Sequence, residues 1–161
     1  MAESGGQEKS KMKRGILYLA VLLIMLLHPT ERADLGKLKP VETVLIYEDR
    51  GQVVLETDTE DQGHGETPQM ALKDMREKSS GIIYMDTADY LLVAEGAESW
   101  IPELGKLLKG KVRICMTETE VDIRGAGSFL AVHKPRCTME TWTPEAEQQL
   151  LTVNNGKMKL R

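Results

Sequence analysis

The sequence predicts an α/β (α+β) fold: a small mixed β-sheet of about five strands packed with two to three helices, preceded by an N-terminal hydrophobic membrane helix. Residues 63–96 have the pattern of a helix followed by two β-rich runs joined by a short link. β-Branched runs precede this unit, and a segment with helical spacing and an alternating run follow it. An unbroken apolar run near the start, residues 15–27, predicts the membrane helix.

The first strands are predicted from β-branched, apolar runs at residues 41–48 and 52–58, which form a hairpin across Asp49-Arg50-Gly51. The first run is nearly continuous in apolar residues, which indicates a central strand covered on both faces. Residues 57–65 are acidic and contain glycine, so we expect an exposed loop there. Later strands are predicted at 82–85, 90–94 and 112–116.

The helix after the acidic loop has clear start and stop signals. Thr67 can accept a hydrogen bond from a free backbone N–H, and Pro68 suits the first helical position because no donor is needed there. Ser79-Ser80-Gly81 ends the segment. Its apolar side is made of Ala71, Leu72 and Met75. These features predict an amphipathic helix that packs against the sheet.

Three further helical segments are predicted. Ser99 is a plausible N-cap for a helix over residues 101–108, which is apolar at helical spacing. Residues 126–133 are expected to form a short helix closed by Pro135, and a last helix is expected to start at Thr143-Pro144 and to precede a loose basic tail.

The N-terminus differs from the rest of the chain because basic residues stand directly before the apolar run. Basic flanks of this kind stay cytoplasmic, so the following residues are expected on the extracytoplasmic side. No small-x-small cleavage site follows the run, which favours an uncleaved signal-anchor over a cleaved signal peptide. A buried core helix is a weaker interpretation because the run has no polar side. The basic residues are Lys9, Lys11, Lys13 and Arg14.

These features divide the chain into five parts. They are a disordered basic N-terminus at 1–14, a hydrophobic signal-anchor or signal peptide at 15–28, a linker at 29–40, an α/β domain at 41–135, and a C-terminal helix with a loose tail at 136–161. The formal net charge of −4 argues against a nucleic-acid partner, which would require a basic face.

Residues that could carry chemistry are few and scattered. Gly63-His64-Gly65 and Gly125-Ala126-Gly127 lack the full glycine spacing of a phosphate-binding loop, so turns are favoured. Asp86 and Asp89, with Glu95 and Glu98 nearby, are interpreted as solvated turn residues and not as a calcium or glycosidase site. We therefore predict no catalytic residue, cofactor or metal. An enzyme would need a pocket that gathers His64, His133 or the Asp86/Asp89 pair.

Cys115 and Cys137 are the two cysteines of the chain. They could form a disulfide if the domain lies outside the cytoplasm, although spacing alone cannot bring their Cα atoms together. Cys115 lies in a strand-like run, where a buried free thiol is an ordinary core residue. Both interpretations remain open from the sequence, and the two cysteines and three histidines have no zinc-ligand spacing.

The order of these elements resembles the N-terminal domain of the Ger(x)C family of spore germination proteins, the lipoprotein subunits of germinant receptors. The resemblance covers about residues 35–135. It rests on Gly65-Glu66-Thr67, Ala71-Leu72, residues 82–93, 101–108 and 112–116, and the small-residue segment 125–130. The family carries a lipidated Cys after the hydrophobic run, whereas Leu27-His28-Pro29-Thr30 holds none, so an uncleaved helix would replace the lipid anchor. The family's C-terminal region has no counterpart, and we expect a stand-alone first domain.

The resemblance and the leader together predict a membrane-anchored, extracytoplasmic, non-catalytic binding domain in spore germination or sporulation. It would be a single-pass protein of the cell or spore membrane, held through residues 15–28. Its implied partners are germinant-receptor membrane subunits. The alternatives are an unrelated membrane-tethered envelope assembly protein, with other envelope proteins as partners, and an enzyme of unknown type.

Overall fold

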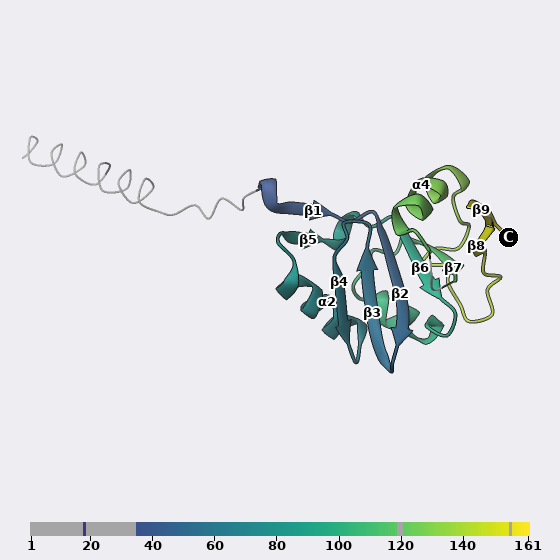
Figure 1. Cartoon of the computed structure of the whole chain (residues 1–161), viewed down its shortest axis with the longest axis horizontal. Coiled ribbons are helices and arrows are strands. Elements are labelled where there is room, and N and C mark those ends of the chain that lie inside the picture. Colours follow the sequence, from purple (N-terminus) through teal and green to yellow (C-terminus); the bar gives the residue numbers. More distant parts are fainter. Residues whose placement is uncertain (1–17, 19–34, 119–120, 155) are drawn as a thin grey trace, which may run out of the picture. The chain divides into compact units, whose positions relative to one another are not determined.

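A computed structural model describes residues 18, 35–118, 121–154 and 156–161 (Figure 1). The predicted disordered N-terminus and nearly all of the predicted membrane helix lie outside these residues. Residues 36–161 form one compact unit. Among the helices that the structure describes, none combines the length and the apolar character needed to span a bilayer.

The main element is a seven-stranded mixed sheet with strand order β4-β3-β2-β6-β7-β8-β9. Strands β2, β6, β7 and β8 are parallel, while β3 and β4 at one edge and β9 at the other are antiparallel to their neighbours. The mixed α/β class is thus confirmed, with more strands in the sheet than the five predicted. The strands are β2 Thr43–Asp49, β3 Gln52–Thr57, β4 Gln62–Gly65, β6 Tyr90–Ala94, β7 Arg113–Thr117, β8 Leu150–Asn154 and β9 Lys157–Leu160.

A second, two-stranded parallel sheet pairs β1 (Leu38–Pro40) with β5 (Ile82–Tyr84). The strand predicted at 82–85 therefore forms, but it lies outside the main sheet. The prediction of a linker over 29–40 is wrong for its last residues, because a short 3-10 helix at Leu35–Lys37 and then β1 occupy them. Three residues of strand carry too weak a periodicity to be recognised without their partner.

Helix α2 (Pro68–Lys78) forms as predicted. Thr67 is its N-cap and accepts a hydrogen bond from the backbone N–H of Met70 at 3.3 Å, and Ser79 is its C-cap. Ala71, Leu72 and Met75 are buried, so the predicted apolar side faces the core.

The other helices begin or end at residues different from those predicted. α3 covers only Ile101–Leu104 and follows a 3-10 turn at Glu98–Trp100. Ser99 lies within this turn, so it is not the N-cap of α3. The chain after α3 continues in turns with i→i+3 hydrogen bonds. α4 covers Ile123–His133 and begins three residues earlier than predicted. Residues 35–118, 121–154 and 156–161 thus contain three α-helices.

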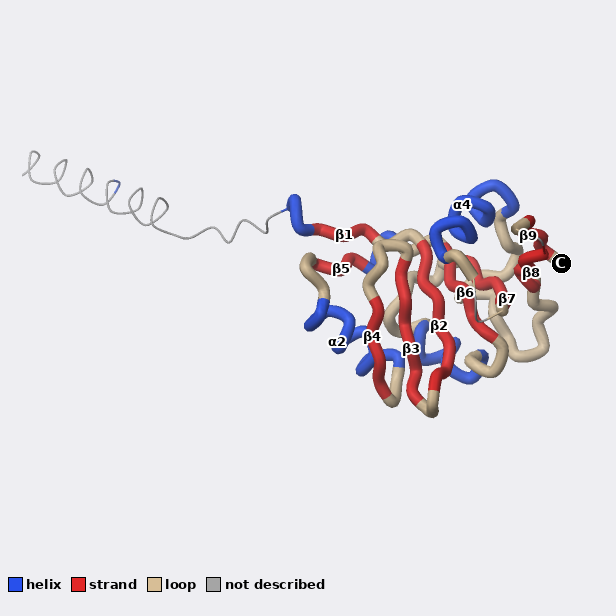
Figure 2. Tube along the Cα trace, in the orientation of Figure 1, coloured by secondary structure: helices blue, strands red, loops and turns tan. Residues whose placement is uncertain are grey.

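Two apolar clusters cover the two faces of the main sheet. Successive residues of β2 alternate between them: Val44 and Ile46 belong to the larger cluster with α2 and α3, and Leu45 belongs to the smaller one with α4. The prediction that residues 41–48 contain a central strand covered on both faces is confirmed. Figures 1 and 2 show α4 over one face of the main sheet. They also show the long loop that leads from α4 to β8.

Two predicted loop or helical regions are strands. The acidic segment 57–65 was expected to be an exposed loop, but residues 62–65 form β4, which pairs with β3 and packs on α2. The prediction of a C-terminal helix and a loose tail at 136–161 is wrong, because the hairpin β8–β9 extends the sheet there. β8 pairs with the free edge of β7 and buries Leu151, and this long-range pairing overrides local helical character.

The domain boundary predicted at residue 135 is also wrong. The backbone carbonyl of Cys137 accepts a hydrogen bond from Ile114 N–H at 2.9 Å, and the sheet continues to Leu160. Residues 136–161 are therefore part of the α/β domain.

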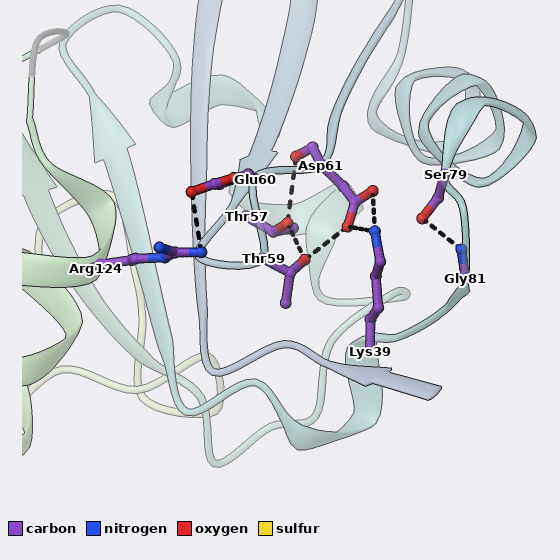
Figure 3. A network of polar contacts seen from close by, with 8 residues as sticks. All are labelled: Lys39, Thr57, Thr59, Glu60, Asp61, Ser79, Gly81 and Arg124. Carbon is purple, nitrogen blue, oxygen red and sulfur yellow. Dashed lines mark hydrogen bonds and ion pairs between the residues drawn. The ribbon is translucent and has the colours of Figure 1, made fainter. Parts of the chain in front are cut away.

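A polar network fixes β1 to the turn between β3 and β4 (Figure 3). Lys39 Nζ lies 3.0 Å from each carboxylate oxygen of Asp61, and Thr59 Oγ1 donates to Asp61 Oδ2 at 2.8 Å. Asp61 is only 9% exposed. Burial alone would raise the pKa of Asp61, but hydrogen bonds from Ser79, Lys39 and Thr59 outweigh it and hold that pKa below its ordinary value.

This network predicts acid sensitivity. Because the folded-state pKa of Asp61 is lowered, its contribution to stability is present above the ordinary pKa of 3.8 and is lost as the pH falls through the folded-state value. We expect Asp61→Asn to lower the thermal midpoint near neutral pH and to flatten its fall below about pH 4. Thermal unfolding of both proteins between about pH 7 and about pH 2 measures this. Parallel pH profiles of the two proteins would contradict it.

Candidate functional site

The topology places a crevice at the carboxyl ends of β6 and β7. These neighbouring strands are parallel. After β6 the chain turns to α3, which packs in the larger cluster, and after β7 it leads to α4 in the smaller cluster. The two connections thus leave for opposite faces of the sheet. In open α/β sheets, ligands bind outside strand ends where the connections diverge in this way.

A cleft of about 420 Å³ lies at this position. Its size falls in the range of small-ligand sites, about 300–1,000 Å³. The end of β6, the end of β7 and the approach to β8 each contribute to it. We call it the strand-end cleft, and its lining residues are Glu95, Glu98, Met116, Thr117, Glu118, Gln148 and Leu150.

The strand-end cleft is acidic. Among the described residues that line it are Glu95, Glu98 and Glu118, and no Lys, Arg or His is among them. Six ion pairs join other described residues, and none of them involves these three glutamates. Three carboxylates on its wall give the cleft a negative potential, which favours a positively charged group.

Thr117 adds a second polar feature to the cleft. Its side chain is 2% exposed, and its hydroxyl has no hydrogen-bond partner among the described residues. The residues beside it on the adjacent strands are Ala94 and Leu151, neither of which has a polar side chain. An unpaired buried hydroxyl costs about 1–3 kcal/mol. The side chain of Thr117 lies on the face of the sheet that carries Cys115 and Leu151, under α4.

A second cleft, of about 440 Å³, lies near the amino end of β2 and is lined by Glu42, Thr43, Asp58 and Arg124 among others. Arg124 and the carboxylate of Asp58 are already engaged within the protein. Arg124 pairs with Glu60 at 3.1 Å (Figure 3) and donates from Nε to the carbonyl of Asp58 at 2.8 Å. This cleft therefore offers less unpaired charge than the strand-end cleft.

The histidines singled out in the sequence lie outside the strand-end cleft. His64 is in the edge strand β4, and its backbone N–H donates to Asp74 Oδ2 at 2.9 Å. His133 ends α4, where its ring lies 4.2 Å from that of Phe129, measured between centroids. Neither histidine is among the described residues that line the strand-end cleft.

The paired aspartates are also outside the cleft, as their interpretation as turn residues predicts. Asp86 and Asp89 are both exposed, and their carboxylates lie 3.8 Å from Lys109 Nζ and Lys111 Nζ respectively. Only Glu95 and Glu98 of that acidic set line the strand-end cleft. The structure thus separates four acidic residues that are close in the sequence into two groups.

Cys115 and Cys137 are both free and buried. They belong to the clusters on opposite faces of the sheet, which explains why no disulfide joins them. Burial raises the pKa of Cys115 to about 12 and also raises the pKa of Cys137. Both thiols are therefore protonated at neutral pH and are poor nucleophiles. The core interpretation of Cys115 is confirmed.

The spacing of the carboxylates limits what they can hold. Among the described residues, no three His, Cys, Asp or Glu side chains come together closely enough to bind a metal ion. The three glutamates of the cleft are thus distributed around its wall and do not converge on one point.

No family model, curated protein or solved structure matches the chain. The resemblance to the Ger(x)C family therefore stays a prediction.

Proposed function

We propose that this chain is a membrane-anchored, non-catalytic binding domain that works outside the cytoplasm, with the strand-end cleft as its binding site. The observation that carries the proposal is the cleft itself, in which three glutamates without an ion pair among the described residues lie at the divergence of two connections. Membrane attachment through residues 15–28 is supported by their basic flank and apolar composition.

Recognition without turnover is supported by the placement of the candidate acid–base groups. His64, His133 and the Asp86/Asp89 pair lie on separate elements and do not line the strand-end cleft. Among the described residues that line the cleft, the glutamates are the groups able to act as a general base, and no histidine, cysteine or serine lies with them.

The biological role is proposed from the family resemblance. The domain would act in spore germination or sporulation, as an accessory to germinant-receptor membrane subunits. Crosslinking in spore membranes followed by identification of partners tests this part. Capture of receptor membrane subunits would support it, whereas capture of other envelope proteins alone would favour an envelope assembly factor.

The topology gives a direct prediction. Alkaline phosphatase, which is active only outside the cytoplasm, is fused behind Arg161. We expect activity in the membrane fraction because the basic flank retains the N-terminus inside. Deletion of residues 15–28 should remove both the activity and the membrane association. A silent phosphatase, together with an active cytoplasmic reporter fused at the same residue, would contradict the proposed location.

A further inference from the structure

We propose that the outward face of the small two-stranded sheet docks on the surface of the lipid bilayer. We call it the β1–β5 face, and it consists of Leu38, Pro40, Ile82 and Tyr84. The inference rests on the proposed membrane attachment of the chain, and it adds which part of the domain contacts the lipid. The domain would then keep one orientation on the membrane and would not turn freely on its tether.

The β1–β5 face is apolar at every position. Paired residues of adjacent strands point to the same side of a sheet, so Leu38 lies beside Ile82 and Pro40 lies beside Tyr84. Pro40 is exposed, and Ile82 and Tyr84 are 49% and 44% exposed. A strand with one face in water normally alternates apolar and polar residues. β5 departs from this pattern, because Ile83 on its inner side belongs to the larger core cluster while its outer side is apolar as well.

The domain holds the β1–β5 face in place. Thr87 Oγ1 lies 2.9 Å from the carbonyl oxygens of both Val41 and Tyr84. On the inner side of β1, Lys39 is fixed to Asp61 (Figure 3). Figure 1 shows the two strands at the end of the domain opposite β8 and β9. Side chains on a fixed backbone lose less conformational freedom when another surface covers them, so this face is prepared for contact.

The size of the β1–β5 face argues against a protein as its partner. Each of its strands has three residues, and alternate residues point inward. A specific protein–protein interface uses about 20–30 residues on each side. A weak contact is enough for a tethered domain, because the anchor already keeps it at a high effective concentration near the bilayer. The small area therefore favours lipid over a second copy of the chain or a separate protein.

The place of the face in the chain favours the same partner. β1 begins at Leu38, and the segment proposed to attach the chain to the membrane ends at residue 28. Residues 29–37 connect them, and a chain of this length spans at most about 30 Å even when it is fully extended. The face therefore stays close to the bilayer. A tyrosine also suits the headgroup region, since its ring is apolar and its hydroxyl can remain in water.

The test uses the full-length protein in vesicles of equal parts phosphatidylcholine and phosphatidylglycerol. Ile82→Cys is labelled with nitrobenzoxadiazole, while Cys115 and Cys137 are buried and stay unlabelled in the folded protein. Part of the phosphatidylcholine carries a nitroxide quencher near the headgroup end of its acyl chain. The control is Val132→Cys with the same label, because Val132 is an exposed apolar residue of α4 outside the face. We expect the nitroxide to quench the label at position 82 at least about threefold more strongly, since interfacial side chains reach the acyl boundary.

A second substitution tests whether the face itself makes the contact. In the labelled Ile82→Cys protein, Tyr84→Glu places a carboxylate on the face, and the removal of a charge from water is costly. We expect quenching at position 82 to fall to the level seen at position 132. Val132→Glu adds the same charge to α4 and should leave quenching at position 82 unchanged. The side chain of Tyr84 is outside the core, so its replacement keeps the fold.

Flotation of the vesicles separates this inference from the proposed function. Full-length protein that does not float with the vesicles would contradict the membrane attachment, and the docking with it. Protein that floats while the labels at positions 82 and 132 are quenched equally would overturn the docking alone. A label at position 82 that is shielded from aqueous iodide, yet is not quenched by the nitroxide, would also overturn it, because a second copy or another protein would then cover the face.

Discussion

Gly63→Ala is expected to destabilise the protein by about 3 kcal/mol. Gly63 lies in β4 where the strand contacts α2. A Cβ atom there would overlap the carbonyl oxygen of Ala71 and would lie 2.6 Å from the backbone nitrogen of Met75. Because both are helix backbone atoms, no side-chain rotation can relieve the overlap, and α2 has to move away from the sheet. Urea unfolding of the full-length protein in detergent measures the loss.

Gly105→Ala is the matched control for this substitution. Gly105 has a helical backbone with φ of −59°, and the nearest atoms to its added Cβ are at an ordinary 3.4 Å. The same chemical change should therefore be neutral or slightly stabilising. Equal stability of the Gly63 and Gly105 variants would show that β4 and α2 do not pack as described.

Leu92→Ala is expected to cost about 2–5 kcal/mol. Leu92 lies in the central strand β6, is fully buried, and belongs to the cluster between the sheet and α4. Truncation removes apolar contacts and leaves a cavity that the rigid sheet cannot close. The urea unfolding midpoint should fall while the dependence of the free energy on urea is retained.

Val132→Ala provides the comparison because Val132 is 77% exposed on α4. It should change the free energy of unfolding by less than about 0.5 kcal/mol. If Val132→Ala and Leu92→Ala lowered the free energy of unfolding by comparable amounts, α4 would not pack on the sheet with Val132 exposed and Leu92 buried, as the structure describes.

The candidate site could be anticipated only in part. The sequence pattern groups Glu95 and Glu98 with Asp86 and Asp89, which are near them in the chain, and interprets all four as solvated turn residues. The structure brings Glu118 and Gln148 to them instead. The signal that could have indicated this is the polar pair Thr117-Glu118 at the end of an alternating strand, since neighbouring parallel strands end at the same edge.

Local signals determined the parts of the fold that depend on nearby residues. The cap at Thr67, the proline at the helix start and the apolar side of α2 are contained within a dozen residues, and the structure confirms them. The continuous apolar run of β2 likewise indicated a strand buried on both faces. In each case the favourable contacts are set by spacing along one element, so the sequence alone was sufficient.

Tertiary structure decided the rest. β1, β4 and the β8–β9 hairpin have weak patterns of their own, and they become strands because β5, β3 and β7 present unpaired backbone groups to them. The opposite placement of Cys115 and Cys137 and the assembly of the strand-end cleft follow from the same pairing. Backbone hydrogen bonds form between any residue types, so the pairing of distant strands leaves little trace in the local sequence pattern. The sequence by itself therefore could not determine which segments pair.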